Sequence, residues 1–72
     1  MGDVNNGKIL KKLGGMLREA REKAKLTQLE AATKAGMDVN YYARIERGLG
    51  NPSYIKLHSI MKALNIKSLV TE

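Results

Sequence analysis

The stretch that decides the fold spans residues 27–48 and reads TQLEAATKAGMDVNYYARIERG. Thr27 is a favourable N-cap residue, and Glu30 follows three positions later. Together they form a capping box, which predicts a helix over residues 28–35. Gly36 stands where a left-handed C-cap residue is wanted. The pattern therefore predicts a short helix that ends in a sharp turn.

A second helix is predicted from Val39 to about Arg47, with Asp38 as its N-cap. Ala32 has a small side chain, which lets the two helices cross closely. Gly36 redirects the chain between them without a steric penalty. This arrangement is a helix-turn-helix, a motif whose second helix can enter the major groove of DNA.

The second helix of this motif has two unlike faces. Tyr42 and Ile45 are three positions apart and point to one side, which we expect to be the core. The opposite stripe carries one amide, two guanidinium groups and no acid; it consists of Val39, Asn40, Ala43, Arg44 and Arg47. Arginines on a helix surface can also be ordinary solvated charges, so the stripe alone leaves both interpretations open.

A longer helix is predicted before the motif, beginning at Lys8. Its apolar residues recur at steps of three and four and share one face; they are Leu10, Leu13, Leu17, Ala20 and Ala24. Gly14 and Gly15 lie inside this run. Each either weakens the helix by about 1 kcal/mol relative to alanine or lets another helix approach closely. Residues 1–7 lack periodicity, so we expect a flexible arm before a domain of residues 8–72.

One more helix and a short terminal turn are predicted after the motif. The helix begins either with Asn51 as N-cap and Pro52 as its first residue, or with Ser53 as N-cap. Asn65 is expected to end it, and residues 67–72 have room for one helical turn. The predicted fold class is therefore all-α, a compact domain of four helices plus a short C-terminal turn.

The charge of the chain favours a polyanionic partner. Its 72 residues include 13 Lys and Arg against 7 Asp and Glu, a net charge of +6. Such a charge points to nucleic acid, or less often to an acidic membrane, although it can also serve solubility alone. The three aromatic residues are tyrosines, two of them adjacent, which suits the stacking platforms of single-strand binders poorly. Double-stranded DNA is the expected partner.

Other classes of function find little support in the composition. Cysteine is absent and His58 is the only histidine, so we expect no disulfide, metal or cofactor. No apolar run approaches the ~20 residues that span a bilayer, and no signal-peptide segment is visible, so we expect a cytoplasmic protein. No paired carboxylates, Cys–His arrangement or phosphate-binding glycine loop appears, so we do not expect an enzyme.

In order and spacing, the chain resembles the Cro/repressor-like (Xre-type) helix-turn-helix family over about residues 8–70. The matching residues are Thr27, Gln28, Ala32, Gly36, Met37, Arg44, Ile45, Glu46, Arg47, Gly48, Asn51, Pro52 and Ser53. Two residues depart from the pattern, because Ala31 replaces the usual leucine and Tyr42 the usual isoleucine or valine. Tyr42 either compensates for the lost core volume or brings its hydroxyl group to the surface.

The resemblance implies a lambda-repressor-like domain of five helices that binds operator DNA as a two-fold dimer. It places the base-reading residues on the exposed face of the second motif helix, at Val39, Asn40, Ala43 and Arg44. Asparagine pairs well with adenine, arginine with guanine, and an apolar group with the thymine methyl. The phosphate contacts that it implies are Gln28, Tyr41, Arg47 and Asn51.

The resemblance also implies a partly buried ion pair between Arg21 and Glu46, which would fix the second motif helix against the first helix of the domain. Three apolar residues either form the dimer surface or close the core: Ile66, Leu69 and Val70. The expected function is sequence-specific regulation of transcription by a homodimer on a palindromic operator. The alternative is a protein-interaction module of the antitoxin or bridging-factor type, which would need an additional partner-binding segment.

Overall fold

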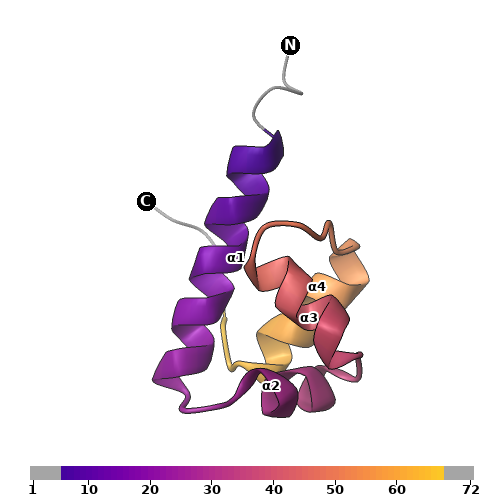
Figure 1. Ribbon diagram of the computed structural model, residues 1–72. Coiled ribbons are helices and arrows are strands. Elements are labelled where there is room, and N and C mark those ends of the chain that lie inside the picture. Colours follow the sequence, from indigo (N-terminus) through magenta and orange to yellow (C-terminus); the bar gives the residue numbers. More distant parts are fainter. Residues whose placement is uncertain (1–5, 68–72) are drawn as a thin grey trace.

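The computed structural model describes residues 6–67, and within this range the chain is entirely helical apart from its turns and loops. The helices are α1 (Asn6–Lys23), α2 (Gln28–Ala35), α3 (Val39–Glu46) and α4 (Tyr54–Ala63). Helix α1 runs along one side of the other three, and its first turns extend beyond them (Figure 1). The all-α class is confirmed. Residues 6–67 hold four helices, one fewer than the five that the resemblance implies. The predicted C-terminal turn lies outside the described residues except for Lys67.

The helix boundaries correct two details of the sequence prediction and decide between the two alternatives that it left open for the start of α4. Helix α1 begins at Asn6, two residues before the predicted start, so part of the expected arm is helical. Arg47 is the C-cap of α3 rather than its last helical residue. Ser53 is the N-cap of α4, since its hydroxyl accepts a hydrogen bond from the Lys56 backbone N–H at 3.2 Å. Pro52 therefore precedes the cap and is not the first helical residue.

The core is small and aliphatic, with one tyrosine at its centre. Contacts between α1 and α3, and between α2 and both α3 and α4, enclose it. Its fully or almost fully buried apolar side chains are Leu17, Ala31, Ala32, Tyr42, Ile45, Ile60 and Leu64. Tyr42 has no exposed surface, so its hydroxyl does not reach the outside of the protein. Ala31 is equally buried, so both departures from the family pattern lie in the core.

Helix α1 lies against α3 almost backbone to backbone. A Cβ atom at Gly14 would lie 2.5 Å from the carbonyl oxygen of Ile45 and 2.7 Å from the carbonyl carbon of Glu46. A Cβ atom at Gly15 would meet nothing within 4 Å. The close approach foreseen for the two glycines is thus confirmed for Gly14 alone. This contact fixes how near α3 stands to α1.

No helix among residues 6–67 is long and apolar enough to span a membrane.

Candidate nucleic-acid interface

Local hydrogen bonds set the beginning of each motif helix. At α2, the Glu30 N–H donates to the Thr27 hydroxyl at 3.0 Å, and the Thr27 N–H donates to the Glu30 carboxylate at 2.8 Å. At α3, the Asp38 carboxylate accepts from the N–H groups of Asn40 at 2.8 Å and Tyr41 at 3.3 Å. Between the helices, Gly36 adopts the left-handed conformation with φ 73°. The predicted capping box, turn and N-cap are all confirmed.

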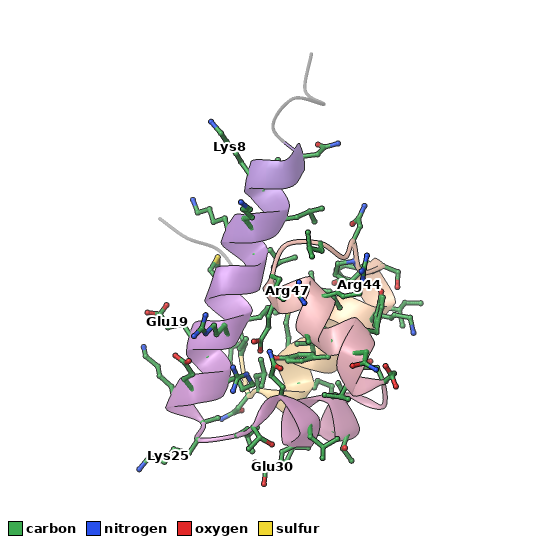
Figure 2. The ribbon with its side chains drawn as sticks, in the orientation of Figure 1. Lys8, Glu19, Lys25, Glu30, Arg44 and Arg47 are labelled. Carbon is green, nitrogen blue, oxygen red and sulfur yellow. The ribbon has the colours of Figure 1, made fainter. Side chains whose placement is uncertain are left out.

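The two faces of α3 meet different surroundings. Tyr42, Ile45 and Glu46 are buried on the inner face. Asn40, Arg44 and Arg47 are exposed, and neither arginine has an ion-pair partner among the described residues. Figure 2 shows both arginines at the same end of α3, away from Glu30 of α2. The outer face therefore presents free donors and two unpaired positive charges.

Of the remaining residues predicted to touch DNA, three lie on α3 and Asn51 lies in the loop that follows it. Val39, Tyr41 and Ala43 are half-buried on α3, where Val39 and Tyr41 also pack against the core. Asn51 is exposed in the loop between α3 and α4. The structure thus gathers the predicted base-reading residues on one helix. Their roles toward DNA remain predictions.

The predicted ion pair between Arg21 and Glu46 is formed. The Arg21 Nε donates to Glu46 Oε2 at 2.6 Å, and Nη2 donates to Oε1 at 3.2 Å. The third guanidinium nitrogen, Nη1, donates to the backbone oxygen of Leu26 at 2.9 Å. The side chains are 13% and 2% exposed, so the pair is largely withdrawn from water. It joins α1 to the end of α3 and to the segment that leads into α2.

The surroundings of Glu46 keep it ionised. Burial acts to raise the pKa of Glu46, but the hydrogen bonds that its carboxylate accepts, above all from Arg21, outweigh burial and hold the pKa below its ordinary value. Tyr42 has no hydrogen-bond partner for its hydroxyl among residues 6–67. Burial, followed by the nearby Glu46 carboxylate, raises the pKa of Tyr42, so the phenol stays neutral.

The side chain of Gln28 makes a contact that the sequence did not predict. Its Nε2 donates a hydrogen bond to Glu46 Oε1 at 3.0 Å, so the side chain belongs to the ion-pair network as well as to the start of α2. The sequence motif could not show this, because the bond depends on where α2 and α3 meet α1. Gln28 is half-buried and still reaches the surface.

Lys56 is a second residue that sequence reasoning missed. Its ammonium group lies 5.7 Å from the centroid of the Tyr41 ring, within the range of a cation–π interaction. The two side chains border a shallow hollow that is also lined by Gly36, Met37 and Asp38. The sequence did carry a signal that sets Lys56 apart. Lys56 lies in the first turn of α4, where the helix dipole makes a positive charge unfavourable. Lys56 adds a cation beside the predicted phosphate contact Tyr41.

Comparisons with known proteins agree with this geometry. A helix-turn-helix family model matches residues 17–70. The immunity repressor protein of Bacillus phage phi105 is 38% identical over 55 residues, which are 76% of this chain and 38% of that protein. An HTH-type transcriptional regulator of Mycobacterium tuberculosis is 35% identical over 57 residues, which are 79% of this chain and 41% of that protein. The chain thus spans well under half the length of the curated relatives that it matches.

A solved structure of similar size shares the fold. The crystal structure of the restriction-modification controller protein C.AhdI from Aeromonas hydrophila superposes with a TM-score of 0.81 at 35% sequence identity. The match covers 83% of this chain and 91% of that chain. The family model, the sequence relatives and the fold lead to one assignment: the chain belongs to the Xre-type helix-turn-helix family.

Proposed function

We propose that this chain is a sequence-specific transcriptional regulator that places α3 in the major groove of double-stranded DNA. The observation that carries the proposal is the outer face of α3, where exposed Asn40, Arg44 and Arg47 stand on a helix whose other face is locked into the core. A rigid support matters because base recognition needs donors and acceptors at fixed positions. The net charge of +6 supplies the attraction to phosphate.

Within this proposal the side chains divide by chemistry. Arg44 donates to guanine, and Asn40 pairs with adenine. Val39 and Ala43 present apolar groups to thymine methyls. Phosphate contacts come from residues at the rims of this face, and they position the domain without selecting a sequence; they are Gln28, Tyr41, Arg47 and Asn51.

We further propose that two copies bind a palindromic operator. A single short helix offers few base contacts, and a two-fold dimer doubles them on half-sites about 10 base pairs apart. Of the predicted dimer residues, Ile66 is half-buried and packs against the core, while Leu69 and Val70 lie outside the described residues.

The first turn of α4 offers a second apolar surface for the other copy. Tyr54 and Ile55 there are 80% and 76% exposed. They end a stretch, residues 48–55, that contains no charged residue in a chain that is 28% charged. Two copies that each carry +6 repel one another least where both surfaces are uncharged. Ile55→Glu should reduce two-copy complexes on DNA in sedimentation, whereas the same charge at Ile9 of α1, which is 59% exposed, should not.

The experiment that tests the function is selection of bound duplexes from a random pool. The wild-type protein should enrich a two-fold symmetric sequence. Arg44→Ala should lose the preference for guanine at one position of each half-site, because only base contacts carry sequence information. Arg18→Ala is the matched control, since Arg18 is exposed on α1, 66% by side chain, and its loss lowers the net charge equally.

Each result of the selection tests a different part of the proposed function. Enrichment of no sequence would reject sequence-specific binding and favour the protein-interaction alternative. Enrichment of a sequence without two-fold symmetry would reject the dimer alone. An unchanged preference in Arg44→Ala would leave the domain a DNA reader and remove Arg44 as the residue that reads guanine.

A further inference from the structure

One buried carboxylate binds two different helices at the edge of the proposed DNA surface. Glu46 Oε2 accepts from Arg21 of α1, and Oε1 accepts both from Arg21, at 3.2 Å, and from Gln28 of α2, at 3.0 Å. The Glu46 side chain is 2% exposed.

Gln28 contacts Glu46 in the interior and also reaches the protein surface. It is the first residue of α2, and its neighbours Thr27 and Glu30 form the capping box, so its backbone is fixed. One N–H of its amide is bonded to Glu46, while the other N–H and the carbonyl oxygen have no partner among residues 6–67. A primary amide has two donors on one nitrogen in a plane, so holding one donor sets the direction of the other.

We propose that Glu46 is a positioning residue for DNA binding: it holds the Gln28 amide so that the second Nε2–H of Gln28 donates to a phosphate oxygen. This rests on the proposed function, in which Gln28 is a phosphate contact. A free glutamine side chain loses rotamer freedom when it binds, and a pre-ordered one has already lost it. The chain of contacts then runs from Arg21 through Glu46 and Gln28 to the DNA.

The test is a double-mutant cycle on the duplex that the wild-type protein enriches from the random pool. Gln28→Met removes both amide donors and keeps the length of the side chain, and it should weaken binding by about tenfold, as expected for a hydrogen bond to a charged group. Glu46→Gln should weaken binding several-fold in the wild-type background. In the Gln28→Met background it should have no effect, because its action passes through Gln28.

A purely structural role for Glu46 predicts a different result, in which Glu46→Gln weakens binding by the same factor in both backgrounds. That result would overturn the proposal, as would wild-type affinity in Gln28→Met. In either case the enriched duplex shows that sequence-specific DNA binding stands, and wild-type affinity in Gln28→Met would remove only Gln28 from the proposed phosphate contacts. If the pool yields no duplex, the proposed function itself fails. Circular dichroism at the binding temperature shows that each variant is folded.

A measurement on the wild-type protein covers the case in which Glu46→Gln does not fold. The two side-chain Nε2 protons of Gln28 are distinct in an NMR spectrum of labelled protein. Adding the enriched duplex should shift one of them strongly and leave the proton bonded to Glu46 close to its free position. Equal shifts of both protons, or of neither, would contradict the proposal.

Discussion

Replacing Gly14 by alanine tests the contact between α1 and α3 most directly. The added methyl group would lie 2.5 Å from the Ile45 carbonyl oxygen and 2.7 Å from the Glu46 carbonyl carbon. Both neighbours are backbone atoms, so no side chain can rotate away to make room. The helices must move apart, and the Arg21–Glu46 hydrogen bonds between them must lengthen.

Two opposing effects set the size of the change. Alanine stabilises a helix interior by about 1 kcal/mol relative to glycine. Overpacking a buried contact costs about 1–3 kcal/mol, and more where the obstacle is backbone, as it is at Gly14. We therefore expect Gly14→Ala to lower the free energy of unfolding by about 2 kcal/mol. For a domain of this size such a loss lowers the melting temperature by about 8–16 °C.

Gly15→Ala is the control, since it places the same methyl group one residue further along the same helix. Nothing lies within 4 Å of that position, so the helix-propensity gain acts alone and should raise the melting temperature by about 4–8 °C. Thermal unfolding followed by circular dichroism, with urea titration beside it, measures both variants. Gly14→Ala melting as high as Gly15→Ala would refute the close approach of α1 and α3.

Three further predictions concern the interior. Arg21→Ala should destabilise the protein by about 3–5 kcal/mol, because it leaves the Glu46 charge buried and unpaired. Arg18→Ala, which breaks an exposed ion pair, should change the stability by less than about 1 kcal/mol. Equal melting temperatures of the two variants would contradict this. The folded-state pKa of Glu46 is depressed, so its contribution to stability is present above its ordinary pKa of 4.5 and is lost as the pH falls through the lower folded value. The stability gap between wild type and Glu46→Gln in urea titrations should therefore narrow from pH 7 to pH 3, and a constant gap would rule out the assigned role. Ala31→Leu should cost about 1–3 kcal/mol by overpacking, and adding Tyr42→Ile should recover part of it; additive losses in the double variant would show that these residues do not compensate.

The motif could be predicted from the sequence because its signals are local. A threonine three positions before a glutamate, a glycine after an alanine-rich run and an aspartate before the next run each act on adjacent backbone groups. The structure accordingly starts α2 and α3 at the predicted residues, Gln28 and Val39. The start of α4 was open in the sequence because Asn51, Pro52 and Ser53 all favour helix beginnings, and only the path of the loop selects Ser53.

Features that depend on how separate helices pack against each other could not be predicted from spacing. Gly14 and Gly15 are adjacent in the sequence but point about 100° apart around α1. Gly14 therefore meets the backbone of α3, while Gly15 faces open space. The bond from Gln28 to Glu46 joins residues 18 positions apart on different helices. Lys56 likewise meets Tyr41 only because the fold brings the first turn of α4 close to Tyr41 of α3. The resemblance supplied the ion pair of Arg21 and Glu46, and the residues alone would not have singled it out.

The division of α3 into an inner and an outer face has a consequence for redesign. The residues that anchor the helix are Tyr42, Ile45 and Glu46, while the base-reading residues proposed above are Val39, Asn40, Ala43 and Arg44. The two sets share no member, although Val39 also touches the core. Asn40, Ala43 and Arg44 can therefore be randomised as a library on an unchanged scaffold. The preferred target could then be reprogrammed without re-engineering the stability of the fold.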